Sequence, residues 1–183
     1  MKVLVFISIL IYSATIAQAQ EPQNYQNQQA GTQIPLNENQ RQTSADALQA
    51  TLDELISQRH AVQQAHWNVQ GPLFHALHEL LGEFYVSIDA IIDEVAERKV
   101  IIGVPANGKV GTVAESVNFQ ELPDGFIPDQ QVLTILSSRY KAMSDRLYQR
   151  IEETENDLPT QDMLIGVTTM IDKQLWMLRS FQQ

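Results

Sequence analysis

Several residue types are scarce or missing in this chain of 183 residues. Cysteine is absent, which excludes disulfide bonds, thiolate metal ligands and cysteine nucleophiles. Histidine occurs four times, and all four lie between His60 and His78. Basic residues number 12 against 22 acidic ones, which gives a formal net charge of −10. That balance opposes binding to DNA or to anionic lipid and favours the binding of cations.

The first 19 residues have the features of a secretory signal peptide. Lys2 supplies a short basic start, residues 3–11 are apolar apart from one serine, and residues 17–19 form an A-x-A end. The apolar run is too short, and its flanks are wrong, for a stable membrane anchor, although an uncleaved anchor or a buried first helix is the alternative. We expect cleavage near Ala19, export to the periplasm or secretion, and no membrane segment afterwards. Without Lys2, 11 basic and 22 acidic residues remain, a charge of −11.

Residues 20–42 form a polar tail. Eight of these 23 residues are glutamine and four are asparagine, with few large apolar residues. Such a segment cannot bury a core, so we predict that it is disordered or loosely attached. It contains no lysine and one arginine, Arg41, so it is not a basic nucleic-acid arm. The folded domain is therefore expected to span residues 43–183.

Apolar residues recur at helical spacing in four segments of that domain. The first runs from Thr43 to Gly71-Pro72, and the second continues to Gly103. The third covers residues 129–154, and the fourth starts at Thr160 after a break at 156–159. The second segment carries the clearest inward stripe, which comprises Phe74, Leu77, Leu81, Phe84, Ile88, Ile91 and Val95.

Residues 103–128 form a long connection rich in glycine and proline, with a possible short helix at 112–119. No alternating strand pattern of useful length occurs. Two helical hairpins joined by one long crossover describe the ferritin-like version of the four-helix bundle. We therefore predict an all-α fold of this type, with a short helix in the crossover.

Two histidines and two carboxylates form the candidate site. His66 lies five residues before Gly71 and His78 seven after it, so an antiparallel hairpin brings the two imidazoles to similar heights. Asp93 and Glu97 are four residues apart and share a helix face. A single histidine is more often structural or exposed, and an isolated acidic pair is more often a solvated surface, here with Arg98 as a partner.

The positions of these residues restrict how they can meet. His78 and Asp93 are fifteen residues apart on one helix, a rise of about 22 Å that no side chain spans. Either the residues form two unrelated half-sites, or the carboxylates of one chain join the imidazoles of another. The nitrogen and oxygen ligands suit iron, and also zinc or manganese. The Glu-x-x-His motif of an intrasubunit di-iron site in this fold is absent.

Three segments carry a family resemblance. Residues 66–71 read His-Trp-Asn-Val-Gln-Gly, and residues 77–79 follow as Leu-His-Glu. Residues 92–98 read Ile-Asp-Glu-Val-Ala-Glu-Arg, and residues 172–176 read Asp-Lys-Gln-Leu-Trp. These segments resemble the two signatures and the closing segment of the Dps family, the small ferritins also called DNA-binding proteins from starved cells. The resemblance covers residues 43–183 in the expected order.

The resemblance implies an assembly and an activity. Dps proteins form hollow homododecamers that oxidise ferrous iron, preferably with hydrogen peroxide, and store the ferric mineral, which protects against oxidative damage. It implies that His66 and His78 of one subunit bind iron together with Asp93 and Glu97 of the two-fold partner. Trp67 matches a tryptophan beside that centre, although a packed core aromatic is the alternative.

The chain departs from the family pattern at Gly82, where an acidic residue is usual. Glu83 is adjacent but points about 100° further round the helix, so it is a poor substitute. We expect a weakened second iron position and a site that holds one metal ion tightly. His75, one turn before His78, could supply an extra ligand or remain exposed.

Two other functions remain open. One is a non-enzymatic helical assembly that sequesters zinc or another metal. The other is a DNA-protecting protein, which is disfavoured because Dps members that bind DNA commonly use lysine-rich tails. Acidic residues could line a pore that guides cations inward, or form a solvated acidic face: Asp145, Glu152, Glu153, Glu155 and Asp157.

Overall fold

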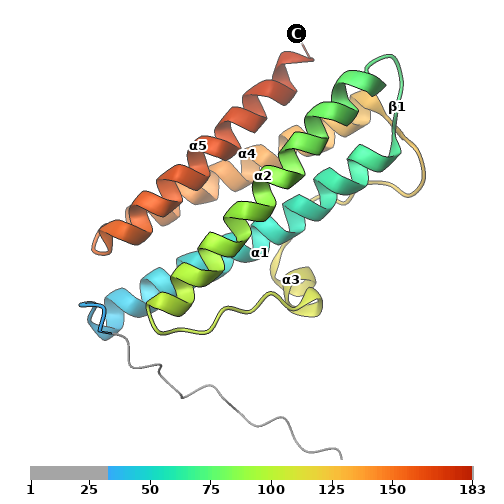
Figure 1. The fold of residues 1–183 in the computed structure, drawn as a ribbon. Helices are drawn as coiled ribbons and strands as arrows, with labels where there is room; N and C mark the ends of the chain where they lie inside the picture. Colours follow the sequence, from blue (N-terminus) through green and yellow to red (C-terminus); the bar gives the residue numbers. More distant parts are fainter. Residues whose placement is uncertain (1–32, 183) are drawn as a thin grey trace, which may run out of the picture.

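Two helical hairpins make up the fold in the computed structural model, which describes residues 33–182 (Figure 1). The elements are α1 (Glu38–Asn68), β1 (Val69–Gln70), α2 (Phe74–Ile101), α3 (Val110–Ser116), β2 (Ile127–Pro128), α4 (Asp129–Glu153) and α5 (Leu158–Ser180). α1 packs along α2, α4 packs along α5, and the crossover between the hairpins carries α3. The predicted ferritin-like four-helix bundle is confirmed. The predicted signal peptide and residues 20–32 of the predicted tail lie outside the described residues.

The first helix begins earlier than predicted. α1 starts at Glu38 and not at Thr43, because Asn37 and Gln40 form a capping box with hydrogen bonds of 3.0 Å in both directions. Arg41 then donates hydrogen bonds to the carbonyl oxygens of Leu36 and Ile102. Residues 38–42 therefore belong to the folded domain and not to a loose tail. The glutamine- and asparagine-rich composition concealed this cap, since the same residue types are typical of disordered segments.

The last helix also begins earlier than predicted. α5 starts at Leu158 with Asp157 as its N-cap, and the Asp157 side chain accepts a hydrogen bond from the Thr160 amide. Pro159 lies in the first turn of the helix, where a proline is tolerated because its missing N–H would have no intrahelical partner. Pro159 is therefore part of the helix start and not a break before it.

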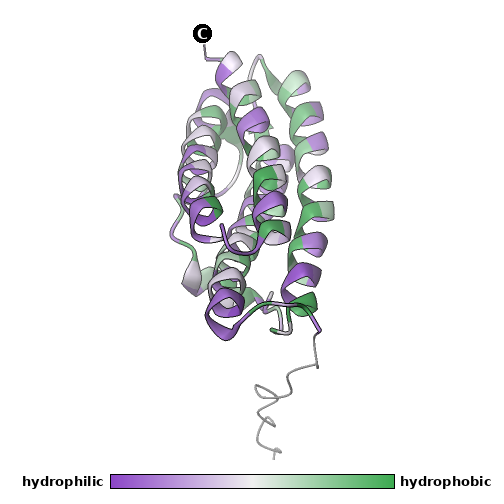
Figure 2. Ribbon diagram, turned by 90° about the vertical axis from the view of Figure 1, so that its left-hand side faces the viewer, coloured by the Kyte–Doolittle hydropathy of each residue, from purple (hydrophilic) through white to green (hydrophobic). Residues whose placement is uncertain are grey.

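The core lies between the two hairpins. The inward residues of α2 are buried as predicted for Leu77, Leu81, Phe84, Ile88 and Val95, whereas Phe74 at the start of α2 is 46% exposed. Figure 2 shows apolar colouring on the inner sides of the helices and polar colouring on their outer sides. In the described part of the chain, no helix is long and apolar enough to span a membrane.

A buried carboxylate closes the turn between α1 and α2. β1 pairs in parallel with β2, Val69 with Ile127, which brings the start of α4 against this turn. Asp129 is 6% exposed, and its Oδ2 accepts a hydrogen bond of 2.9 Å from the Leu73 amide. Gly71 has φ +132°, and a Cβ atom there would lie 2.4 Å from Asp129 Oδ2. Only glycine fits this position without strain.

Candidate metal centre

The imidazoles of His66 and His78 stack on each other where α1 and α2 approach the Gly71 turn. Their ring centroids are 3.8 Å apart with an interplanar angle of 17°. His66 Nδ1–H donates to the His78 carbonyl oxygen at 2.7 Å, and His78 Nδ1–H donates to the His66 carbonyl oxygen at 2.9 Å. A carbonyl oxygen can only accept, so each ring carries its hydrogen on Nδ1. The Nε2 lone pair of each ring is therefore free to bind a metal ion.

Local structure explains these two hydrogen bonds. The His66 carbonyl lies in the last turn of α1, where it has no intrahelical donor, and His78 supplies one. A Cβ atom built on Gly82 would lie 3.4 Å from His66 Cε1. Because glycine has no side chain, the His66 ring lies directly beside the backbone of α2 at this position. The predicted approach of His66 and His78 is confirmed, and we call this pair the histidine half-site.

Asp93 and Glu97, which we call the acidic half-site, are exposed on α2. Within residues 33–182 neither carboxylate has an ion pair or a hydrogen bond to another side chain. Arg98 lies instead against the start of α5, where Nη2 is 2.8 Å from Asp157 Oδ1 and Nε donates to Thr160 Oγ1 at 2.9 Å. The pairing of Arg98 with this acidic surface, which was part of the alternative interpretation, is therefore wrong. Both carboxylates are exposed, as that interpretation also held, and both remain available for a cation.

Two of the five acidic residues proposed to line a pore form ion pairs with basic side chains. Asp145 pairs with Lys141 in the next turn of α4. Asp157 is buried against Arg98. Burial raises the pKa of Asp157, but hydrogen bonds from Thr160 and Ser44 and the positive charge of Arg98 outweigh it, so the net pKa is lowered. Asp145 is exposed despite its ion pair, and so are the remaining three residues: Glu152, Glu153 and Glu155.

The two half-sites do not meet within one chain. Among the described residues, no three His, Asp or Glu side chains come close enough to hold a metal ion. At about 100° per residue, His78, Val86, Asp93 and Glu97 nevertheless fall within one stripe of α2 that is about 100° wide. Val86 lies midway between the half-sites and is 60% exposed. Most of this stripe of α2 is exposed, because no other part of the described chain packs against it.

Comparisons with known proteins place the chain in a family. Residues 45–183 match the family model of the ferritin-like domain. The chain is 30% identical over 154 residues to the DNA protection during starvation protein of Agrobacterium fabrum, covering 83% of this chain and 95% of that protein. The chain belongs to the Dps family of ferritin-like proteins. The sequence resemblance to this family is confirmed.

Two further relatives of this Dps chain differ in how much of their length it spans. It is 38% identical over 141 residues to DNA protection during starvation protein 2 of Deinococcus radiodurans, covering 76% of this chain but only 58% of that relative. The solved structure of Dps from Microbacterium arborescens in the high iron form has a TM-score of 0.76 and 29% identity. That similarity covers 80% of this chain and 96% of the solved one.

Aromatic residues surround the histidine half-site of the Dps chain unequally. The Tyr85 ring lies edge-on to His66, with centroids 5.4 Å apart and an interplanar angle of 70°. Trp67 is 61% exposed, so the packed-core interpretation of this residue is wrong. Sequence reasoning did not identify Tyr85 as part of the site. Its position seven residues after His78, two helical turns along α2, is the signal that places it on the same face.

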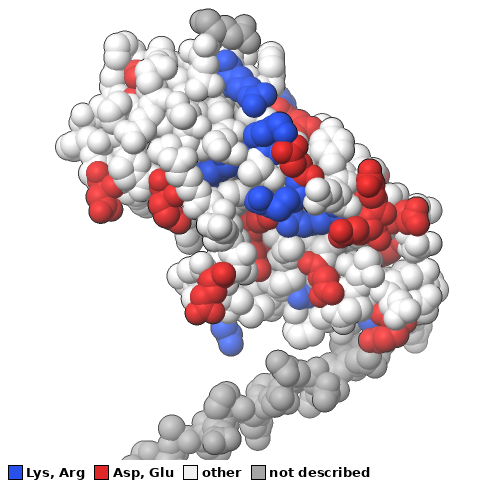
Figure 3. All heavy atoms as spheres, turned by 180° about the vertical axis from the view of Figure 1, so that it is seen from behind, with Lys and Arg blue, Asp and Glu red and all other residues white. Residues whose placement is uncertain are grey.

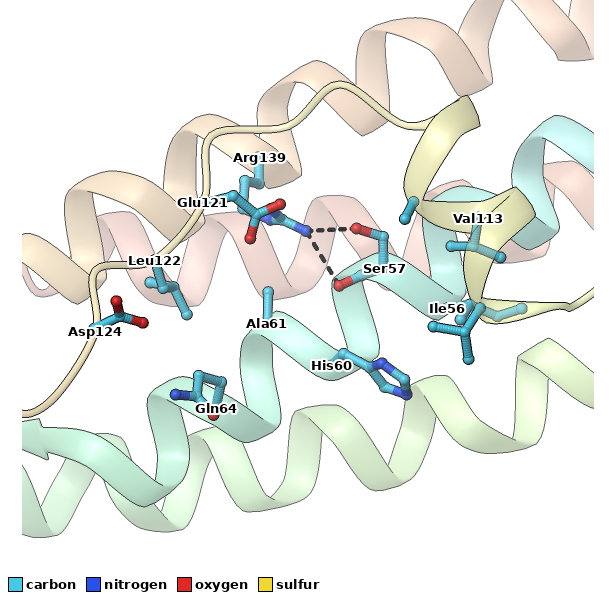
Figure 4. A pocket seen from close by; sticks show the side chains of 12 residues that line it. Ile56, Ser57, His60, Ala61, Gln64, Val113, Glu121, Leu122, Asp124 and Arg139 are labelled. Carbon is cyan, nitrogen blue, oxygen red and sulfur yellow. Dashed lines mark hydrogen bonds between the residues drawn. The ribbon is translucent and has the colours of Figure 1, made fainter.

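The other two histidines of the Dps chain lie apart from the pair. His60 is exposed and lines a cavity of about 390 Å³ between α1 and the crossover (Figure 4). There the buried Arg139 of α4 donates hydrogen bonds to the carbonyl and hydroxyl oxygens of Ser57, and these two bonds join α4 to α1. His75 is exposed on α2, and its side chain has no hydrogen bond within residues 33–182. Among the described residues, neither side chain makes a hydrogen bond or a ring contact with the histidine half-site.

Proposed function

We propose that this Dps protein is an exported mini-ferritin that oxidises ferrous iron and stores the ferric product. In this proposal the histidine half-site of one subunit and the acidic half-site of its two-fold partner bind ferrous iron, which is the substrate. Hydrogen peroxide is the proposed oxidant, and a homododecamer is the proposed assembly. The observation that carries the proposal is the reciprocal hydrogen bonding of His66 and His78, which presents two free Nε2 atoms side by side.

The ligand chemistry supports iron as the substrate. Two imidazoles and two free carboxylates form a mixed nitrogen and oxygen set, which suits iron better than a soft metal. The two carboxylates also offset the charge of a divalent ion. Hydrogen bonds through Nδ1 hold both rings in place, so metal binding requires little reorganisation of the histidine half-site. The high iron form of the Microbacterium arborescens relative is in keeping with this assignment.

The shape of α2 supports a site shared between two copies. Under a two-fold axis, an antiparallel pair of α2 helices that crosses near Val86 places each histidine half-site opposite the partner's acidic half-site. The exposed side chain of Val86 would then be covered by its own symmetry copy. Packed helix axes lie about 8–10 Å apart, and each Cα lies about 2.3 Å from its own axis. The two facing Val86 Cα atoms would therefore lie close enough for a disulfide bond between cysteines at this position.

Val86→Cys is expected to join subunits in pairs. Because the native chain has no cysteine, the introduced thiol can bond only to its copy in another subunit. Mild oxidation followed by a denaturing gel without reductant should show a covalent dimer. Val100→Cys is the matched control, since Val100 is 52% exposed on the same helix but lies about 20 Å along it from the proposed crossing point. Equal dimer yields from both variants would contradict the shared-site geometry.

Iron oxidation distinguishes the proposed enzyme from a metal-sequestering assembly. Ferrous iron is titrated into mature protein without oxygen, hydrogen peroxide is added, and ferric absorbance is recorded. We expect rapid formation of ferric product, and its suppression by Zn²⁺, which suits the same ligands but has no redox chemistry. Tight metal binding without any ferric product would instead support sequestration.

DNA protection, which the names of the relatives state, is not what we propose for this chain. The net charge is −10. On the face of the described residues in Figure 3, basic side chains lie beside acidic ones and do not form a patch of positive charge alone. A DNA-binding surface neutralises several phosphates with lysine and arginine. Residues 1–19 support export, which would also separate the protein from chromosomal DNA.

A further inference from the structure

We infer that Tyr85 donates one of the two electrons that reduce hydrogen peroxide at this site, an inference that rests on the proposed function. Reduction of peroxide to water takes two electrons, and one ferrous ion supplies only one. A second ferrous ion normally supplies the other in a two-iron site. The structure leaves this chain short of a ligand for that second ion and places an oxidisable ring beside the first.

The missing ligand is at Gly82. This residue lies against His66, and a Cβ atom there would be 3.4 Å from His66 Cε1 and 3.6 Å from His66 Nδ1. Any carboxylate at this position would therefore lie beside the metal-binding ring. Glycine provides none, and Glu83 is exposed on a different part of the helix surface. One iron ion bound by the two half-sites is the stoichiometry that these residues support.

Tyr85 is placed to supply the second electron. Its ring is in edge contact with the His66 ring, so an electron can pass to bound iron through one ligand imidazole. Among the described residues, Tyr85 is the only tyrosine or tryptophan whose ring contacts His66 or His78. Phe74 contacts His78 at a centroid distance of 5.3 Å, but phenylalanine is much harder to oxidise.

The surroundings of Tyr85 favour loss of an electron together with a proton. The Arg59 guanidinium lies over the ring, 5.7 Å from its centroid, and is held by Asp89 at 2.9 and 3.2 Å. A fixed positive charge over the ring disfavours a radical cation and favours the neutral phenoxyl radical. The Tyr85 hydroxyl has no hydrogen-bond partner within residues 33–182, so its proton is free to leave to solvent.

The step balances with peroxide as the oxidant. One Fe²⁺, one H₂O₂, the Tyr85 phenol and one proton give one Fe³⁺, the Tyr85 phenoxyl radical and two molecules of water. The O–O bond of peroxide breaks and the O–H bond of the phenol breaks, while iron and tyrosine each lose one electron. A later one-electron donor, such as a second ferrous ion, returns the radical to tyrosine.

Electron paramagnetic resonance of rapidly frozen samples tests this step. Wild-type protein loaded with ferrous iron and mixed with peroxide should give a tyrosyl signal that changes shape when the tyrosines are deuterated. Tyr85→Phe should lose that signal, release more hydroxyl radical to a spin trap and keep its anaerobic affinity for ferrous iron. Tyr148→Phe on α4 is the matched control and should keep the signal. A radical that persists in Tyr85→Phe but disappears in Trp67→Phe would overturn the inference.

Gly82→Asp provides a second, independent variant. The spacing at residue 82 accommodates a side chain, so the variant should fold and bind a second ferrous ion. For this variant we expect two ferrous ions to be oxidised per peroxide and the tyrosyl signal to be lost. In the first turnover of the wild type we expect one ferrous ion to be oxidised per peroxide and a strong tyrosyl signal. Two irons per peroxide and no radical in the wild type would refute the role of Tyr85 and leave the proposed function standing. Absence of ferric product in the wild type would refute both.

Discussion

Subunits with His66→Ala and subunits with Asp93→Ala should each fail to oxidise iron alone and regain activity when they are assembled together. In a mixed two-fold pair, one site combines both defects, while the other combines an intact histidine half-site with an intact acidic half-site. Random mixing of equal amounts makes half of the pairs mixed, and half of the sites in those pairs are intact. The initial rate of ferric absorbance should therefore recover to about a quarter of the wild-type value.

The matched control places both defects on the same half-site. A mixture of His66→Ala and His78→Ala subunits has no intact histidine half-site in any pair, so it should stay inactive. The double variant His66→Ala/Asp93→Ala should also be inactive while its assembly, measured by light scattering, is unchanged. Recovery in the control mixture, or none in the first mixture despite co-assembly, would mean that the half-sites do not combine across subunits.

Gly71→Ala is expected to destabilise the domain by about 3 kcal/mol, because strain and a steric clash act together. Its φ of +132° is unfavourable for alanine, and the new Cβ would lie 2.4 Å from the buried Asp129 carboxylate. Thermal unfolding at fixed protein concentration measures the loss. Iron oxidation should fall as well, since the turn sets the register of His66 and His78.

Gly166→Ala is the matched control for that change. Gly166 lies in the interior of α5, and a Cβ atom there would have nothing within 4 Å. Alanine should therefore stabilise the domain slightly, by roughly 0.5–1 kcal/mol. If Gly71→Ala unfolds at the same temperature as the wild type, the turn is not constrained as the structure indicates.

The sequence was sufficient to predict what depends on short separations along the chain. Helical periodicity predicted the four long helices, and the distances of His66 and His78 from Gly71 predicted that the two rings meet. The same reasoning placed Asp93 and Glu97 together on α2 and excluded a complete site within one chain, in keeping with the absence of a three-residue cluster in the described part.

Contacts between distant segments were beyond the reach of that reasoning. The alternative interpretation of Asp93 and Glu97 paired them with Arg98, but Arg98 pairs with Asp157, 59 residues further along the chain. Asp129 was expected only as the first residue of a helix, yet its carboxylate closes the α1–α2 turn from 56 residues away. Such choices depend on how the two hairpins dock, and no local pattern in the sequence encodes that docking.

The two-residue ladder between β1 and β2 limits how the histidine half-site can be engineered. It joins the turn of the first hairpin to the start of the second, with Val69 opposite Ile127 and Gln70 opposite Pro128. A peptide of residues 38–101 would keep both histidines but lose the ladder and the Asp129 carboxylate that holds the turn. The first hairpin alone therefore does not maintain the half-site. Grafting it onto another scaffold would transfer the two histidine ligands but not their relative positions.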